Sequence, residues 1–122
     1  MLRVRTCVRV LLTSSHPLPD GTRVRLRLPQ VGDRLSLRIL HERLGAPLDD
    51  VRLTRILRFD PRACVSVVAT TFQGVTEELV GYGHVDRDGG DQLIVADEGV
   101  APGVSGLLSA ALAERTGTRH VA

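Results

Sequence analysis

Residues 91–116 read DQLIVADEGVAPGVSGLLSAALAERT, and they combine a strand pattern, a turn pattern and a helix pattern in succession. The first six residues are mostly apolar and partly β-branched, which predicts a short strand at 91–96. Gly and Pro mark a connection at 97–103, and the Leu- and Ala-rich segment 104–116 predicts a helix that ends at Gly117. The first backbone N–H groups of such a helix have no partner inside the helix, so its first turn attracts anions.

The rest of the chain shows alternating strand and helix patterns. Period-two alternation and β-branched runs predict strands, and apolar residues at helical spacing predict helices. The elements expected before residue 91 are a strand at 2–12, a loop at 13–21, a strand at 22–28, helices at 31–44 and 49–58, strands at 63–71 and 78–86, and a hairpin turn at Arg87–Gly90. After the helix at 104–116, a further strand is expected to begin at 118–122. This order predicts an α/β (α+β) fold, with a mixed, mainly antiparallel sheet and helices on both faces.

The first predicted helix has residues typical of helix ends. Asp33 is expected to cap its start through the side-chain carboxylate. Leu35, Ile39 and Leu40 recur at helical spacing and are expected to face the core. Gly45 stands just after the last turn, where a left-handed backbone often ends a helix.

The net charge of +2 hides an uneven distribution. Residues 1–62 hold 13 Arg and 6 acidic residues, whereas residues 63–122 hold 3 Arg and 8 acidic residues. The basic half is either a nucleic-acid surface or the electrostatic partner of the acidic half, within the chain or across a dimer. Because the Arg residues alternate with apolar ones, contact between the halves is the favoured interpretation, and nucleic acid is not an expected partner.

Pairing of the strands at 2–12 and 22–28 would bring like charges together. Six Arg residues would share one face, namely Arg3, Arg5, Arg9, Arg23, Arg25 and Arg27. Like charges on neighbouring strands repel each other. The acidic stretch Asp86–Asp91 is one candidate to relieve this repulsion, and solvent is the other.

Composition excludes several classes of site. All 16 basic residues are Arg, which rules out Schiff-base catalysis by Lys and a lysine-containing P-loop. Aromatic residues make up 2%, too few for a platform that stacks single-stranded nucleic acid. Cys7 and Cys64 lie in apolar runs without metal-binding spacing, so no metal is expected, and buried free thiols are typical of a cytoplasmic protein. No apolar run reaches the ~18 residues of a membrane span.

The strand that ends in LIVAD, the sequence Gly-Val-Ser at 103–105 and the Leu-rich helix behind it resemble the central segment of the GNAT superfamily of N-acetyltransferases. The upstream text LPDGTRVRLR and GDRLSLRILHERL resembles the first strand and helix of GNAT domains, notably those of bacterial protein acetyltransferases. The family pattern Gln/Arg-x-x-Gly-x-Gly/Ala falls on Val100–Ser105. There, Gly103 matches, Ser105 is a small replacement, and Val100 replaces the polar residue.

The resemblance implies one domain, 1–122, in which 1–17 is an additional N-terminal strand and loop and 18–122 is GNAT-like. It stops before the last helix and the last two strands of the family. It implies an acetyl-CoA-dependent N-acetyltransferase that acts on an amine of a small molecule or of a protein lysine. The cofactor contacts that it implies lie at the end of the strand and in the first helical turn, at Val95, Ala96, Gly103, Val104, Ser105 and Gly106.

Two features of the turn predict weak cofactor binding. Pro102 has no N–H group to offer, and Asp97 and Glu98 bring negative charge close to the expected position of a diphosphate.

Amide transfer from a thioester also needs a base that accepts the proton of the amine. Asp91 and Glu98 are the candidate bases.

Other interpretations stay open. The chain is alternatively a non-catalytic homodimerisation or regulatory module, in which a second copy completes the sheet. His84 is either a base that lines the cleft or a satisfied structural residue, and Tyr82 is expected to pack in the core. Gly81 and Gly83 are expected to allow a close approach or a bulge. Ser105 lacks the surroundings of a nucleophile elbow, so a hydrolase is not favoured.

Overall fold

A computed structural model describes residues 15–58, 60–87 and 92–116. Five strands form one sheet in the order β1-β2-β3-β4-β5, and every neighbouring pair is antiparallel. The strands are β1 (Ser15–Pro17), β2 (Arg23–Arg27), β3 (Cys64–Gln73), β4 (Thr76–Asp86) and β5 (Gln92–Ala96). The helices are the 3-10 turn η2 (Val31–Asp33), α1 (Arg34–Arg43), α2 (Asp50–Leu57) and α3 (Val104–Thr116). The predicted strands at 2–12 and 118–122, and most of the turn at Arg87–Gly90, lie outside the described residues.

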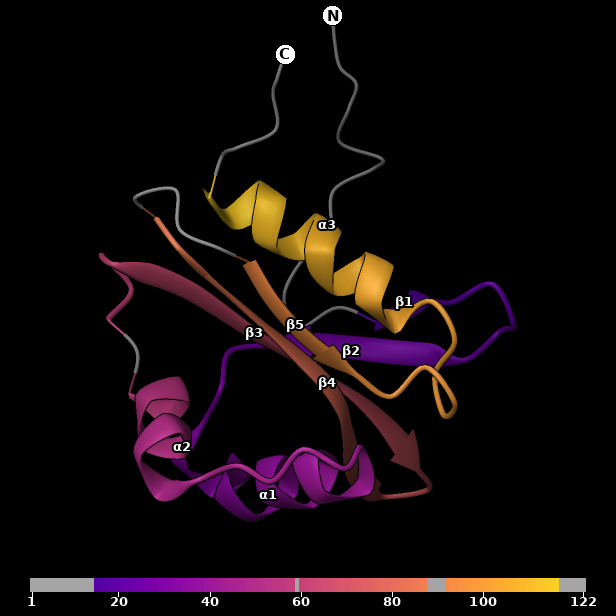
Figure 1. The fold of residues 1–122 in the computed structure, drawn as a ribbon. Coiled ribbons are helices and arrows are strands. Elements are labelled where there is room, and N and C mark those ends of the chain that lie inside the picture. Colours follow the sequence, from indigo (N-terminus) through magenta and orange to yellow (C-terminus); the bar gives the residue numbers. More distant parts are fainter. Residues whose placement is uncertain (1–14, 59, 88–91, 117–122) are drawn as a thin grey trace, which may run out of the picture.

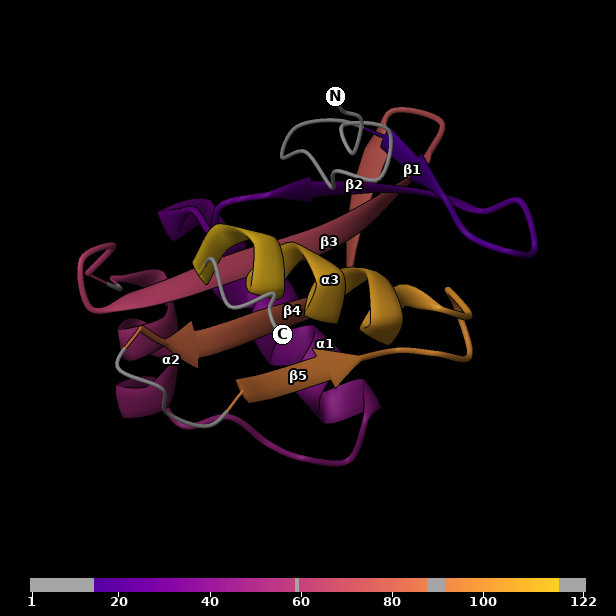
Figure 2. The ribbon, with the colours of Figure 1, turned by 90° about the horizontal axis from the view of Figure 1, so that it is seen from above.

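Helices cover both faces of the sheet, as the sequence predicts. Figure 1 shows α3 on one face and α1 with α2 on the other. Viewed from above, α3 lies across the central strands (Figure 2). One apolar cluster fills the space between α3 and the sheet, and a second one lies between the sheet and the other two helices.

Two glycines of β4 let α3 approach the sheet closely. A Cβ atom at Gly81 would lie 3.0 Å from the carbonyl oxygen of Val95 and 3.1 Å from Leu108. A Cβ atom at Gly83 would lie 2.8 Å from Leu112. The register between β3 and β4 also shifts next to Gly81, which marks a bulge. The prediction of a close approach or a bulge is therefore confirmed at both residues.

The loop predicted at 13–21 is partly wrong, because β1 lies within it. Ser15 pairs with Arg25 and Pro17 with Arg23. The Arg23 guanidinium also donates a hydrogen bond to Ser15 Oγ, at 3.1 Å. Pro is tolerated here because β1 is the edge of the described sheet, where a missing N–H interrupts no ladder. Ser and Pro content alone therefore misses a short edge strand.

The apolar stripe predicted for α1 is wrong at two of its three positions. Leu40 is buried, but Leu35 is 66% exposed and Ile39 is 48% exposed. The buried face holds Leu37, Leu40 and His41. Apolar residues occur on several sides of α1, so spacing alone did not select Leu37, and a count of apolar residues leaves out the buried His41.

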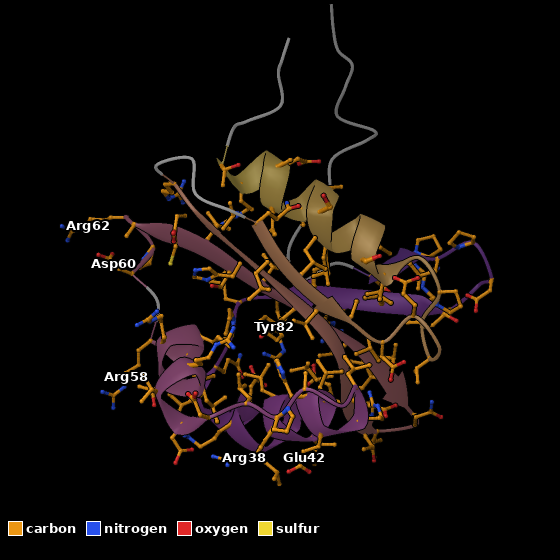
Figure 3. The ribbon with its side chains drawn as sticks, viewed as in Figure 1. Arg38, Glu42, Arg58, Asp60, Arg62 and Tyr82 are labelled. Atoms are coloured by element: carbon orange, nitrogen blue, oxygen red, sulfur yellow. The ribbon has the colours of Figure 1, made fainter. Side chains whose placement is uncertain are left out.

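His41 is buried because both ring nitrogens have polar partners. Nδ1 lies 2.8 Å from the carbonyl oxygen of Ala46, and Nε2 lies 2.8 Å from the hydroxyl of Tyr82. Since a carbonyl oxygen only accepts, Nδ1 is the donor to Ala46, and Nε2 is the partner of the Tyr82 hydroxyl. Burial raises the pKa of Tyr82, which keeps its hydroxyl protonated. Tyr82 extends from the sheet toward α1 (Figure 3), so the pair anchors this helix.

Asp33 stands at the start of α1, but its side chain does not cap the helix. Its carboxylate binds the Arg27 guanidinium at 2.7 and 2.8 Å and accepts the N–H of Gln30 at 2.7 Å. Burial would raise the pKa of Asp33, but the hydrogen bonds from Arg27 and Gln30 outweigh it and hold this pKa below its usual value. The predicted role as a cap is corrected: Asp33 joins β2 to the start of α1.

Acidic residues of the second half of the chain relieve the charge of the first half. Arg27 also binds Glu77, at 3.1 Å, and Arg43 binds both Glu78 and Asp97. The predicted contact between the two halves is thus confirmed within the chain. Asp33 and Glu77 neutralise Arg27, whereas residues 88–91 of the predicted acidic stretch lie outside the described residues.

Candidate cofactor site at the start of α3

The turn between β5 and α3 is held by a buried aspartate. The backbone N–H of Asp97 donates to Val80 of β4, at 2.8 Å. The Asp97 carboxylate accepts the N–H groups of Gly99 and Val100, both at 3.2 Å. Arg43 of α1 donates to the same carboxylate at 2.7 Å. The negative charge of Asp97 is therefore compensated by Arg43 and repels an incoming anion less than the sequence suggests.

The carboxylate of the neighbouring residue, Glu98, binds backbone N–H groups at the start of α3. One carboxylate oxygen accepts the N–H of Gly103 and the other accepts the N–H of Ser105, both at 2.8 Å. Backbone donation from Gly103, followed by the side chain and backbone of Ser105, lowers the pKa of Glu98 against a small opposing effect of burial. Two of the amides expected to contact a diphosphate thus bind an oxyanion that belongs to the chain.

Gly103 has a conformational reason to be glycine. Its φ of +97° lies in the left-handed region, where a side chain is strained. A Cβ atom would also lie 3.1 Å from the ring of Pro19. The match of Gly103 to the family pattern is therefore explained by the turn itself, with or without a ligand.

The remaining predicted cofactor residues lie around this turn. Val95 and Ala96 end β5 and pack on opposite faces of the sheet, Ala96 beneath α3 and Val95 toward α1 and α2. The N–H of Val104 donates to Ala101, at 3.1 Å. Gly106 is exposed in the first turn, and a Cβ atom there would meet nothing within 4 Å. Asp91 lies outside the described residues.

A second polar set, which sequence analysis did not combine, crosses β3 and β4. Ser66 and His84 are paired in register, and Ser66 Oγ lies 2.8 Å from Nδ1 of His84. His84 Nε2 lies 3.5 Å from the Asp86 carboxylate. Ser66 is buried, so a substrate has no access to its hydroxyl. Ser66 and His84 are brought together by the pairing of β3 with β4, which joins residues 18 positions apart in the chain.

The described residues contain neither a membrane-spanning helix nor a cluster of metal ligands. Among the helices of this part of the chain, none combines the length and the apolar character that crossing a membrane requires. Within the same residues, no three His, Cys, Asp or Glu side chains are grouped closely enough to hold a metal ion. Cys64 is buried, and burial raises the pKa of its thiol.

No protein-family model matches the sequence, and no curated protein does either. Among solved structures, the crystal structure of the GNAT domain of S. lividans PAT superposes with a TM-score of 0.69. The match covers 88% of this chain and 73% of that domain, at 21% identity. The chain has a GNAT-like fold. At this identity the likeness establishes the fold alone.

Proposed function

We propose that this chain is an acetyl-CoA-dependent N-acetyltransferase of GNAT type, in which Glu98 competes with the cofactor for the start of α3. The observation that carries the proposal is the pair of 2.8 Å hydrogen bonds from Gly103 and Ser105 to one carboxylate. These bonds indicate that the two amides are oriented to bind an oxyanion. A diphosphate offers the same acceptor geometry to the start of a helix.

Glu98 is able to leave this position without disturbing the core. Its side chain is exposed, and the turn keeps its shape through Asp97 and Arg43. Giving up a helix cap costs about 1 kcal/mol. That cost corresponds to an affinity for acetyl-CoA that is about fivefold weaker than it would be without the carboxylate.

Gly106 supports the same proposal. Glycine in an exposed helix costs roughly 0.5–1 kcal/mol relative to alanine, and neighbouring atoms leave room for a Cβ here. Small residues at a helix start allow a ligand to approach the backbone closely. The expected substrate is an amine of a small molecule or of a protein lysine, and Asp91 and Glu98 are the proposed bases.

Calorimetric titration with acetyl-CoA and with CoA tests the proposal. We expect the wild type to bind both, Glu98→Ala to bind about fivefold more tightly, and Glu42→Ala to match the wild type, because Glu42 is an exposed carboxylate on α1. The absence of heat at millimolar ligand for both the wild type and Glu98→Ala would contradict the proposal. If Glu98 is also the base, the same variant lowers kcat while it lowers KM.

One observation favours a second function, a homodimerisation module. Among the described residues β5 pairs with β4 alone, so its other edge has no described strand partner, and Leu93 of β5 is exposed. A second copy that adds a strand there would satisfy this edge. Analytical ultracentrifugation tests this function: a concentration-dependent dimer supports it, and a stable monomer at micromolar concentration contradicts it.

A further inference from the structure

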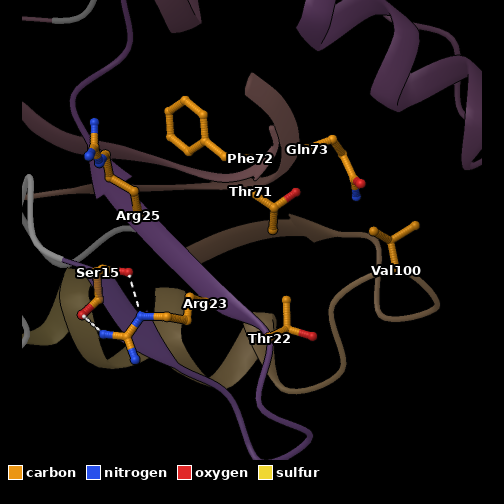
Figure 4. A pocket seen from close by; sticks show the side chains of 8 residues that line it. All are labelled: Ser15, Thr22, Arg23, Arg25, Thr71, Phe72, Gln73 and Val100. Atoms are coloured by element: carbon orange, nitrogen blue, oxygen red, sulfur yellow. Dashed lines mark hydrogen bonds between the residues drawn. The ribbon is translucent and has the colours of Figure 1, made fainter. Parts of the chain in front are cut away.

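A cavity lies at the end of the sheet where β2 and β3 part. The pairing between the two strands ends at Arg25 and Thr70, although both strands continue. The cavity has a volume of about 440 Å³, which is within the range of small-molecule sites. Figure 4 shows the side chains that line it, which are Ser15, Thr22, Arg23, Arg25, Thr71, Phe72, Gln73 and Val100.

Two arginines give this cavity positive charge that no described carboxylate neutralises. Arg23 donates to Ser15, and Arg25 lies over the ring of Phe72 at 5.1 Å from its centroid. Neither guanidinium forms an ion pair within residues 15–58, 60–87 and 92–116. Arg27, on the same face of β2, binds Asp33 and Glu77 instead. Of the three arginines of β2, the two that form no ion pair among the described residues therefore lie at the cavity end of the strand.

The cavity wall also holds an unsatisfied hydroxyl group. Thr71 is 6% exposed, and its Oγ1 has no hydrogen-bond partner among the described residues. A buried hydroxyl without a partner loses the free energy of its hydrogen bonds to water. Thr71 lines the cavity, so an acceptor bound there lies beside this residue.

We propose that the cavity between β2 and β3 binds a small organic oxyanion, a carboxylate or phosphate group on an apolar body. Arg23 and Arg25 pair with the oxyanion, and guanidinium groups suit it because they offer several donors in one plane. Phe72 and Val100 contact the apolar body. The site is distinct from the amides that Glu98 occupies, so it does not depend on the function proposed above.

Amide chemical-shift titration of the full chain tests the site with three probes. Benzoate carries a carboxylate, phenyl phosphate carries a phosphate, and benzamide is the neutral counterpart. We expect saturable shifts at Thr71 and Phe72 with benzoate, with phenyl phosphate or with both, and at least fivefold weaker binding of benzamide. The stronger of the two anions identifies which oxyanion the site prefers.

Arg25→Gln is the decisive variant, and Arg62→Gln is its matched control. Arg62 is an exposed arginine before the start of β3, whereas the cavity lies at the other end of that strand (Figure 3). We expect at least fivefold weaker anion binding in Arg25→Gln and a change of less than twofold in Arg62→Gln. If Arg25→Gln does not fold, Arg23→Gln provides the same comparison. Equal binding of benzamide and the anions, unchanged affinity in the cavity variants, or no shift at millimolar anion would overturn the proposal.

Discussion

Replacing Glu98 with alanine is expected to destabilise the fold slightly and in a pH-dependent way. The variant removes two charge-assisted hydrogen bonds at the start of α3. A helix cap of this kind contributes about 1 kcal/mol, and solvent reduces the part that comes from charge because Glu98 is exposed. A loss of ~0.5–1 kcal/mol corresponds to a decrease in Tm of roughly 2–5 °C for a chain of this length.

The pH dependence follows from the lowered pKa of Glu98. A carboxyl whose pKa is lower in the folded state than in the unfolded state stabilises the fold above its unfolded pKa, which is near 4.5. That contribution is lost as the pH falls through the folded pKa. The difference in Tm between the wild type and Glu98→Ala is therefore expected at pH 7 and should shrink toward pH 3. Calorimetric melts across this range provide the measurement, with Glu42→Ala as the control. A Tm difference between the two proteins that is the same at pH 3 and pH 7 would contradict the role of the Glu98 carboxylate as a cap of α3.

Two further pairs of variants test the packing that positions the site, and urea unfolding measures the stability of each. Asp33→Ala should lower the free energy of unfolding by about 2–4 kcal/mol, because it leaves the mostly buried Arg27 with Glu77 as its one remaining ion-pair partner. Glu77→Ala should lower it by under about 1 kcal/mol, because the Glu77 side chain is more exposed. Equal losses would contradict this assignment. Gly81→Ala should cost about 1–3 kcal/mol by pushing α3 from β4, and Gly106→Ala should stabilise the fold by roughly 0.5–1 kcal/mol. A tolerated Gly81→Ala would show that α3 has room to move.

Local patterns predicted most of the secondary structure. The helix at 104–116 has its expected bounds, and the helix predicted at 49–58 corresponds to α2, Asp50–Leu57. Gly45 has the expected positive φ of 76° after α1. These features depend on residues close together in the chain, so spacing and residue type suffice to find them.

Features that depend on tertiary contacts were missed or assigned to the wrong face. The buried face of α1 depends on His41, whose burial requires Tyr82, 41 positions away. The edge strand β1 depends on its pairing with β2. The sequence placed the charge of Glu98 near the turn, but the two hydrogen bonds depend on the path of the connection to α3. The cavity lies where the pairing of β2 with β3 ends, and a hydrophobic pattern does not predict where that pairing ends.

The most direct test of the proposed function follows the amide signals of Gly103 and Ser105 during a titration with acetyl-CoA. We expect both signals to shift and saturate in the wild type, and to do so at about fivefold lower cofactor concentration in Glu98→Ala. This result would place the cofactor on the amides that Glu98 occupies. Signals that stay unchanged in both proteins at millimolar acetyl-CoA would contradict competition between Glu98 and the cofactor.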